Sequence, residues 1–242
     1  MLRGDEVHVW LADLNQPAAV IEAYLSLLSV DERERAESFL FQRDRDHYIL
    51  ARGILREIVA RYLKIEPKLL CFAYNAFGKP ALVCETGQPP LRFNISHSHE
   101  IALYAVGYDR ELGIDVEYIR QDIAAMEIAE HFFSSLEIAA LRSVSPNQQT
   151  EAFYKCWTRK EAYIKAVGQG FSRSLDQFDV SLSPGEPAVI LRSHDNEAET
   201  LNWTLREIAL GSSYAAAVTV EGSGWSLSCW EWLSIRTLSP NC

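Results

Sequence analysis

The order of secondary-structure patterns, which repeats in the two halves of the chain, most constrains the fold. Residues 45–63 (RDHYILARGILREIVARYL) have apolar side chains at helical spacing, and residues 150–168 (TEAFYKCWTRKEAYIKAVG) form a second long helical pattern that ends at a glycine. Short strand patterns follow each helix, and the segment ALYAVGY in the first half resembles YAAAVTV in the second. The sequence therefore predicts an α+β fold of two similar, pseudo-repeated lobes, each a small antiparallel sheet with a long helix.

This repeat also gives the expected boundaries. We expect an N-terminal lobe over residues 1–110, a C-terminal lobe over residues 111–222, and a C-terminal extension over residues 223–242 that adds a strand. If the two lobes pack against each other, the crevice between them is the expected active site. A capping pattern at Ser29 and Glu32 predicts the start of a helix, and a shorter helix is expected around residues 132–143.

The composition argues against several classes of protein. The chain has 242 residues and is 48% hydrophobic, enough to bury a core as one large domain or two small ones. Its net charge of −10 argues against a general nucleic-acid binder. No apolar run approaches the ~18 residues of a membrane span, and the start lacks the apolar segment of a signal peptide. The five cysteines form no CxxC pair, so a reduced, cytoplasmic setting is expected.

Two carboxylates stand close together in the segment LGIDVEYIR, residues 112–120. Residues two apart in a strand point the same way, so Asp115 and Glu117 share one face while Ile114 and Val116 share the other. A strand with one solvated face would explain this pattern, because acids are common on such faces. Like charges at this spacing repel each other, however, so a cation is expected to offset them.

A stripe of three residues on the second long helix supplies a further acid. Trp157, Glu161 and Lys165 are spaced four apart and lie on one side of that helix. Glu161 and Lys165 alone can be an ordinary surface pair worth roughly 0.3–0.5 kcal/mol. Neighbouring apolar residues instead place them at the edge of a packed face. A carboxylate there would complete a three-oxygen set with Asp115 and Glu117, the kind of ligand that Mg²⁺ takes.

The segment FNISHSH suggests contacts to phosphate or ribose. Asn94, Ser96 and His97 are expected in a loop after a strand, where short polar side chains can bind an anion. An adjacent serine and histidine also suggest a hydrolase. That interpretation is disfavoured, because adjacent residues on an extended chain point apart and no G-x-S-x-G elbow is present.

Several basic residues of the first half are candidates for a phosphate site. Arg52 lies on the first long helix, Lys79 in the turn FGKP, and Arg33 and Arg35 on the preceding helix. Each of them alone is most simply a solvated surface charge. Together with a nearby metal ion they would form a cradle for polyphosphate.

Five segments, taken in order, carry a family resemblance. FGKP, FNISHS, GIDVE, FFSSLE and WTRKEAYIK resemble segments of the surfactin-type (Sfp-type) 4′-phosphopantetheinyl transferases, and the match extends over residues 29–220. The resemblance implies their fold of two similar lobes. It also implies an Mg²⁺-dependent enzyme that transfers the 4′-phosphopantetheine arm of coenzyme A to a serine of an apo acyl or peptidyl carrier protein and releases adenosine 3′,5′-bisphosphate.

The resemblance implies roles for the acidic residues and one lysine. By position, Asp115, Glu117 and Glu161 resemble the ligands of Mg²⁺, with Mn²⁺ as an alternative. Glu161 is also the implied base for the carrier serine. Lys165 resembles the residue that stabilises or protonates the leaving phosphate. These assignments give catalytic roles to Glu161 and Lys165.

Four other residues are implied in coenzyme A binding. Lys79, Ser96 and His97 would hold the nucleotide and its phosphates, and Arg52 resembles the family's arginine for the 3′-phosphate. Some relatives carry two basic residues in the preceding helix, where this chain has Glu32 and Arg35. The grip on the 3′-phosphate is therefore expected to depend on Arg52 and His97.

Two other functions are compatible with some of these features. One is another Mg²⁺-dependent phosphotransferase or pyrophosphatase that uses a nucleotide. The other is a non-catalytic module that binds a carrier protein or coenzyme A. The presence of all four of Asp115, Glu117, Glu161 and Lys165 favours the transferase. A monomer is expected, because two fused lobes can form one site.

The docking surface for the carrier is expected after the strand that bears Asp115. Carriers of this kind are small acidic helical bundles and this chain is itself acidic, so docking needs a local apolar and basic patch. The segment IRQDIAAMEIAEHFF offers Ile119, Ile123, Met126 and Ile128 beside Arg120. Met126 is the expected exposed contact, and the alternative is that these apolar residues form ordinary helix core.

Overall fold

A computed structural model of the chain describes residues 2–83, 90–168, 174–194 and 200–232. The first half contains, in chain order, β1 (Glu6–Asp13), α1 (Ala18–Leu25), α2 (Val30–Glu37), α3 (Gln42–Leu63), the 3-10 helix η1 (Pro67–Leu69), β2 (Phe72–Tyr74), β3 (Pro80–Leu82), β4 (Leu91–Ser98) and β5 (Ile101–Tyr108). The second half contains β6 (Leu112–Tyr118), α4 (Ala125–Phe132), α5 (Ser135–Ser143), α6 (Pro146–Val167), the 3-10 helix η3 (Leu175–Gln177), β7 (Phe178–Val180), β8 (Ile190–Ser193), β9 (Trp203–Glu207) and β10 (Tyr214–Glu221), and β11 (Ser226–Glu231) follows.

The strand order confirms the predicted α+β fold with two similar lobes. One sheet has the order β11-β1-β5-β4 and the other has the order β6-β10-β9. In each half, the last strand lies between two others. It pairs with the first strand of that half on one side and with the second-last strand on the other. Helices α3 and α6 each contain 22 residues, and both end at a residue in the left-handed conformation, Lys64 and Gly168.

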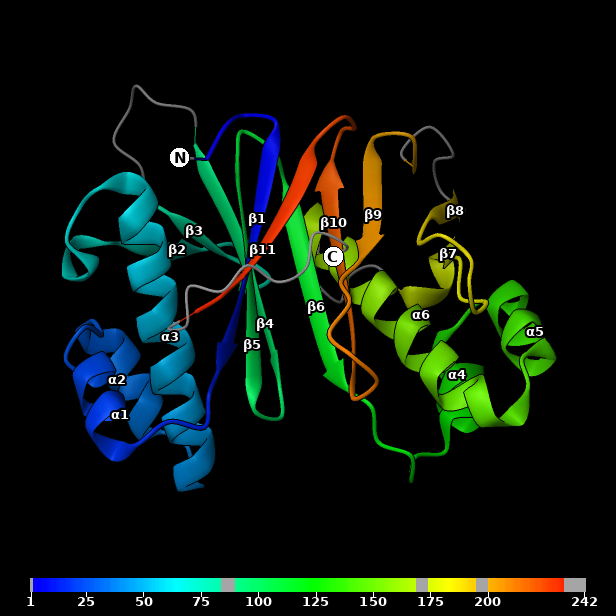
Figure 1. The fold of residues 1–242 in the computed structure, drawn as a ribbon, viewed down its shortest axis with the longest axis horizontal. Coiled ribbons are helices and arrows are strands. Elements are labelled where there is room, and N and C mark those ends of the chain that lie inside the picture. Colours follow the sequence, from blue (N-terminus) through cyan, green and yellow to red (C-terminus); the bar gives the residue numbers. More distant parts are fainter. Residues whose placement is uncertain (1, 84–89, 169–173, 195–199, 233–242) are drawn as a thin grey trace.

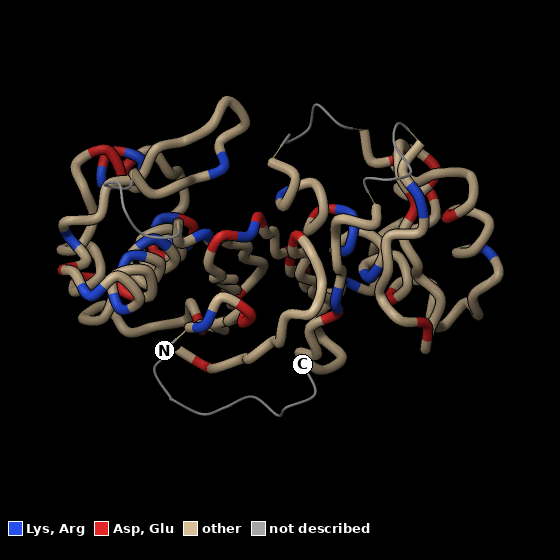
Figure 2. Tube along the Cα trace, turned by 90° about the horizontal axis from the view of Figure 1, so that it is seen from above, with Lys and Arg blue, Asp and Glu red and all other residues tan. Residues whose placement is uncertain are grey.

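The two halves stand side by side with their sheets in the middle. Helices α1–α3 cover the outer side of the first sheet and α4–α6 lie on the outer side of the second (Figure 1). Positions of Lys and Arg are intermixed with those of Asp and Glu in both halves (Figure 2). The tail contributes β11, which runs parallel to β1 and closes the other edge of the first sheet. No helix within the described ranges is long and apolar enough to cross a membrane.

Three apolar clusters hold these layers together. One lies between α3 and the first sheet, and a second lies between α4–α6 and the second sheet. The third fills the space between the two sheets, where alternate residues of the central strands meet: Val7, Val9, Leu103, Ala105, Leu112, Ile114, Val116, Ala216 and Val218. The alternation in β6 therefore puts its apolar face toward the first lobe and its acidic face toward α6.

Helix α6 approaches β6 unusually closely because of one glycine. A Cβ atom at Gly113 would lie 2.2 Å from the carbonyl oxygen of Ala162 and 2.3 Å from the backbone nitrogen of Ala166. Only a residue without a side chain permits this approach. Asp115 and Glu117 follow on the same face of the strand, so the contact at Gly113 brings the C-terminal part of α6 close to the acids.

The shorter helix that was expected around residues 132–143 is confirmed as α5, which begins at Ser135. Helix α4 ends at Phe132, and Ser134 caps α5 in a capping box with Glu137. In a capping box, the serine side chain bonds a backbone N–H group of the first helical turn that has no partner within the helix. The capping box predicted at Ser29 and Glu32 is confirmed at the start of α2.

Candidate active site

The two lobes are joined where β4 runs beside β6. This junction uses side chains, because the backbone N–H groups of β6 donate to side-chain oxygens of β4. Three donor–acceptor pairs follow each other along the strands at alternate positions: Ile114 to Asn94 at 2.9 Å, Val116 to Ser96 at 3.4 Å, and Tyr118 to Ser98 at 3.0 Å. Asn94, Ser96 and His97 thus lie within strand β4, and the prediction that they form a loop is wrong.

Asp115 is buried at the centre of this junction. Its Oδ1 atom accepts a hydrogen bond from Ser96 Oγ at 2.8 Å and lies 2.6 Å from Lys165 Nζ. The ammonium group of Lys165 also donates to Ser96 Oγ at 3.0 Å and to the carbonyl oxygen of Ile114 at 3.3 Å. Three elements, β4, β6 and α6, therefore meet at one carboxylate, and Lys165 is the cation that faces it.

The other two predicted acids lie close enough to Asp115 to feel its charge. Burial and then repulsion by Asp115 raise the pKa of Glu117 above its ordinary value, against the opposing hydrogen bond from Ser98 Oγ at 2.8 Å. Burial and then Asp115 also raise the pKa of Glu161, and Lys165 opposes this shift. The structure thus brings Asp115, Glu117, Glu161 and Lys165 together, as the sequence predicted.

The side chains of this site do not form a closed metal centre as they stand. Within the described ranges, no three His, Cys, Asp or Glu side chains are arranged to hold a metal ion. Two observations nevertheless fit a bound cation. Asp115 Oδ2 is buried and has no hydrogen-bond partner in the described structure, and Glu117 and Glu161 are both disfavoured as anions. An added cation would relieve the repulsion and would be coordinated by the unpaired Oδ2 atom of Asp115.

Two of three neighbouring hollows are lined by one or more of the charged residues Glu117, Glu161 and Lys165. One of 540 Å³ is lined by residues that include His97, Ser98 and Glu117, and one of 420 Å³ by residues that include Arg52 and His97. A third, of 280 Å³, is lined by residues that include Lys79, Glu161 and Lys165. His97 lines the first two hollows, and Gly78, Pro80 and Ile95 line the second and third. The hollows are therefore neighbours: the first and third lie between the lobes, and the second lies beside them in the first lobe.

Arg52 is held in a buried polar network beside the second hollow. Its guanidinium lies 2.8 Å from Glu32 Oε1 and donates to the hydroxyl of Tyr74 at 2.6 Å. Glu32 also accepts from Arg56 at 2.6 Å. Burial would raise the pKa of Glu32, but the hydrogen bond from Arg56 and the charge of Arg52 outweigh it and lower this pKa. One carboxylate thus serves two arginines, which leaves net positive charge in the wall of the hollow.

Lys79 and His97 complete the set of predicted binding residues. Lys79 Nζ lies 3.0 Å from Glu111 Oε2 and donates to the carbonyl oxygen of Ala166 on α6 at 3.1 Å. Burial lowers the pKa of His97 below 6.5, and the charge of Lys165 lowers it further. His97 is therefore mainly neutral at pH 7 and acts as a hydrogen-bonding group. The sequence had suggested that it could carry a positive charge. Ser96 is already bonded to Asp115 and Lys165.

Two residues of the site were missed at the sequence level. Tyr74 holds Arg52, and Ser98 holds Glu117. Ser98 continues the alternate spacing of Asn94 and Ser96, so a strand interpretation of the segment would have found it. Tyr74 lies on a three-residue strand whose pairing to β3 gave no comparable signal.

Comparison with known proteins agrees with this site. Residues 111–219 match a family model described as the 4′-phosphopantetheinyl transferase superfamily, and residues 16–107 match one described as 4′-phosphopantetheinyl transferase, N-terminal. The chain is 38% identical over 231 residues to the 4′-phosphopantetheinyl transferase HetI of Nostoc sp., covering 96% of this chain and 94% of that protein. It is 32% identical over 161 residues to the 4′-phosphopantetheinyl transferase Sfp of Bacillus subtilis, covering 66% and 69%.

The likeness to solved structures is more partial. A holo-(acyl-carrier-protein) synthase from Bacillus anthracis matches 47% of this chain and 96% of its own chain, with 23% identity and a TM-score of 0.37. The chain belongs to the 4′-phosphopantetheinyl transferase superfamily, and it is an enzyme of this class. The family resemblance of the sequence motifs is confirmed.

The repulsion among the acids predicts a pH-dependent effect on stability. Because the pKa of Glu117 is raised in the folded state, its ionisation costs stability as the pH rises through that pKa, and the cost is absent below about 4.5. We expect Glu117→Gln to raise the melting temperature at pH 7 without added metal by about 2–4 °C, the shift that 1 kcal/mol produces in a chain of this size. The gain should shrink as the pH falls toward 4.5.

The control for this experiment is Glu22→Gln, which removes one exposed carboxylate from α1. Thermal unfolding followed by circular dichroism at several pH values compares both variants with the wild type. A gain at Glu117 that is the same at all pH values, or is matched by Glu22→Gln, would show that the carboxylates do not repel each other as described.

Proposed function

We propose that this enzyme transfers the 4′-phosphopantetheine arm of coenzyme A to a serine of an apo acyl or peptidyl carrier protein, and that the reaction depends on Mg²⁺. In this step the serine oxygen forms a bond to phosphorus of the phosphopantetheine phosphate. The bond from that phosphorus to the bridging oxygen breaks, and adenosine 3′,5′-bisphosphate leaves. The observation that carries the proposal is the convergence of Asp115, Glu117, Glu161 and Lys165 in one crevice of a chain that belongs to this family.

Three acids are proposed as the metal ligands. Asp115, Glu117 and Glu161 would hold Mg²⁺, or Mn²⁺ in its place, and the free Oδ2 of Asp115 supports this assignment. When bound, the ion would neutralise charge on the pyrophosphate oxygens and orient the phosphate group that is transferred.

Glu161 and Lys165 are proposed to handle the proton and the leaving charge. The raised pKa of Glu161 makes its carboxylate a better proton acceptor near neutral pH, which suits a base for the serine hydroxyl. Lys165 Nζ lies on the wall of the hollow that Glu161 also lines, and its three donors can stabilise or protonate the leaving phosphate. Its present contacts with Asp115 and Ser96 hold the ammonium at that position.

The first lobe is proposed to bind the nucleotide part of coenzyme A. Arg52 and His97 line one hollow, where the net charge of the arginine network favours the 3′-phosphate. Lys79 and Ser96 lie nearer Lys165 and are proposed to contact the other phosphates. One chain supplies both walls of the crevice, so we also propose that a monomer is active.

Transfer to a carrier protein tests the whole proposal. Incubation with coenzyme A, Mg²⁺ and several apo carrier proteins should add one phosphopantetheine group to a carrier, as measured by intact mass. We expect Asp115→Ala and Glu161→Ala to lower the rate more than roughly 100-fold, because even outer partners of metal ligands cost 10–100-fold. Glu117→Ala should be milder if water replaces its oxygen.

The control is Asp122→Ala, an exposed acid just beyond β6. Circular dichroism should show that all four variants are folded. A rate near the wild type in Asp115→Ala at low Mg²⁺ would contradict the metal assignment, and failure of the wild type on every carrier would contradict the proposed reaction.

A second prediction concerns the 3′-phosphate of coenzyme A. Charge-assisted hydrogen bonds from Arg52 are worth about 1.5–3 kcal/mol, so Arg52→Ala should weaken coenzyme A binding roughly 10- to 100-fold. Binding of dephospho-coenzyme A, which lacks this phosphate, should change much less. Titration calorimetry measures both ligands, and Arg142→Ala, an exposed arginine on α5, is the control. Equal losses for the two ligands would show that Arg52 does not contact the 3′-phosphate.

The structure changes the expected docking surface for the carrier. Met126, Ile123 and Ile128 are only partly exposed and pack against the core of the second lobe, and Ile119 is buried. Met126 thus belongs mainly to the helix core, which is the alternative that the sequence left open. Beside the 540 Å³ hollow, which Glu117 lines, Leu40 is 89% exposed and Phe41 is 65% exposed.

These two residues are proposed as apolar anchors for the carrier. They directly follow Phe39, which lines the hollow together with Arg43 and Arg120, so an acidic helical partner would meet apolar and basic groups at its mouth. We expect Leu40→Asp with Phe41→Asp to raise KM for the carrier at least roughly fivefold, which is about 1 kcal/mol, and to leave KM for coenzyme A unchanged. The control is Leu201→Asp, also 86% exposed but next to β9. An equal rise in KM for the carrier in the double variant and in Leu201→Asp would exclude this surface.

A further inference from the structure

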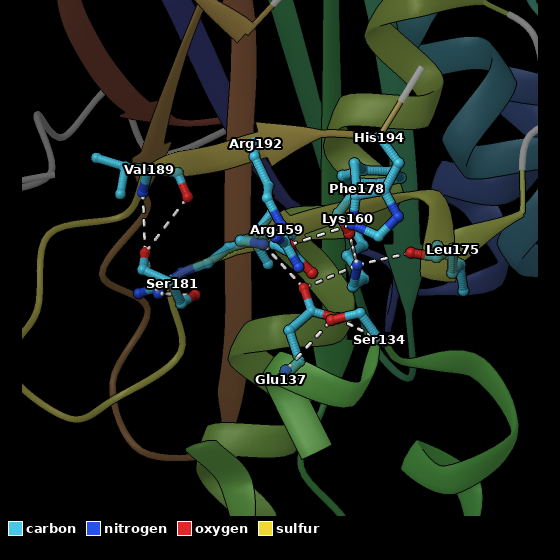
Figure 3. A network of polar contacts seen from close by, with 12 residues as sticks. Ser134, Glu137, Arg159, Lys160, Leu175, Phe178, Ser181, Val189, Arg192 and His194 are labelled. Atoms are coloured by element: carbon cyan, nitrogen blue, oxygen red, sulfur yellow. Dashed lines mark hydrogen bonds and ion pairs between the residues drawn. The ribbon is translucent and has the colours of Figure 1, made fainter. Parts of the chain in front are cut away.

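A fully buried lysine lies next to Glu161 on helix α6. Lys160 is 0% exposed, and its Nζ atom lies 2.8 Å from Glu137 Oε1. The same ammonium donates to the carbonyl oxygens of Leu175, at 2.6 Å, and Phe178 (Figure 3). All three of its donors are therefore used, and none of them reaches the crevice. The lysine cannot contact a substrate.

The partner of Lys160 is tied to two further elements. Glu137 belongs to the capping box of α5, where its Oε2 atom accepts from the backbone N–H of Ser134 at 3.0 Å. Its Oε1 atom accepts from the backbone N–H of Val180 in β7 at 2.8 Å. The ion pair thus joins α6 to α5, to the 3-10 helix η3 and to β7. Figure 3 shows these groups converging on the lysine.

The first lobe contains the same arrangement. Arg56 occupies the fifteenth position of α3, as Lys160 does in α6, and it bonds Glu32 of the capping box of α2 at 2.6 Å. Arg56 also donates to the carbonyl oxygens of Pro67 and Leu70 around η1, at 3.0 and 3.1 Å. Each half of the fold therefore has a buried cation that links a capping glutamate to the turn after the long helix.

Stability alone gives a weak reason for such a pair. Taking two charges out of water costs several kcal/mol per ion, and replacement of a buried ion pair by apolar residues is often neutral or stabilising. A pair with fixed partners does, however, set one orientation of the helix. Consecutive helix residues point about 100° apart, so anchoring Lys160 toward the core fixes where Glu161 and Lys165 point.

We propose that Glu137 and Lys160 are a positioning pair that fixes the rotation and height of α6 and thereby places Glu161 and Lys165 opposite Asp115. This inference rests on the roles of Glu161 and Lys165 in the proposed function. Arg159 adds a second anchor on the same turn, through Ser181 at 2.6 Å and Glu207 at 2.6 Å, but it holds a different side of the helix.

The test removes both charges together, so that neither is left unpaired. In Glu137→Gln with Lys160→Met, we expect kcat to fall roughly 10- to 100-fold, as for other partners that orient metal ligands. KM for coenzyme A should stay unchanged, because the first lobe holds the nucleotide. Electron paramagnetic resonance titration with Mn²⁺ in the presence of coenzyme A should show a loss of metal affinity. Rates are measured well below the melting temperature and are divided by the number of coenzyme A sites found by calorimetry, so that unfolded protein does not count.

Val59→Ala is the control for a mere loss of stability. It truncates a fully buried apolar side chain of α3 in the core of the first lobe, which has no part in the arginine network. We expect it to lower the melting temperature but to leave kcat and Mn²⁺ affinity per coenzyme A site unchanged. If the double variant merely lost stability, kcat and Mn²⁺ affinity per site would respond in the same way in both proteins. A positioning role lowers these two quantities only in the double variant.

A wild-type kcat and Mn²⁺ affinity per site in the double variant would overturn the proposal. If the double variant does not fold, Lys160→Arg supplies the test: it keeps the charge but lengthens the anchor, and it should lower kcat without changing KM for coenzyme A, while an unchanged kcat would overturn the inference. Glu161→Ala in the same assay distinguishes failure of the positioning pair from failure of the roles that the proposed function gives to Glu161. Full activity in Glu161→Ala would contradict the roles proposed for Glu161, whatever the variants of Lys160 do.

Discussion

The rest of the structure depends on the junction between β4 and β6. Backbone N–H groups that are buried without an acceptor cost free energy, and the N–H groups on this side of β6 find no backbone partner in β4. Asn94, Ser96 and Ser98 supply the acceptors in turn, at the spacing of a strand. Two of the same hydroxyls then donate to Asp115 and Glu117. The contacts that join the lobes therefore also orient the acids, so lobe packing and site geometry cannot vary independently.

The same junction concentrates negative charge, which the fold tolerates only in part. Lys165 compensates Asp115 directly, while Glu117 and Glu161 retain raised pKa values because burial and the charge of Asp115 both disfavour their ionised forms. A site optimised for stability would lack one of these acids. Their persistence in a buried crevice is the pattern expected where a cation and a substrate with phosphate groups are to be bound. The buried network around Arg52 has the opposite local excess, since Glu32 is shared by two arginines.

The duplicated fold explains how these opposite charges come to face each other. Each half uses the same strand order, a long helix of the same length, and a buried cation at the same helical position. The halves then differ in what the long helix presents. Helix α3 presents Arg52 one turn before its buried cation, and α6 presents Glu161 immediately after its own. One framework thus yields a basic wall and an acidic wall, which the crevice brings together.

The sequence by itself determined the local features of this protein. The spacing of two in GIDVE, the spacing of four in the stripe of Glu161 and Lys165, the capping box at Ser29 and the order of the elements all depend on residues close in the chain, and the family motifs identified the enzyme class. Only the tertiary structure showed that the NISHS segment is a strand, that Lys160 is buried, and that Leu40, rather than Met126, is exposed. Asparagine and serine have the same local preferences in a turn as at a junction, and a lysine in a helix has no local signal of burial. Their roles follow from partners 15 to 43 residues away in the chain, such as Val116 for Ser96, Leu175 for Lys160 and Val180 for Glu137, and those partners meet only when the two lobes and their helices have packed.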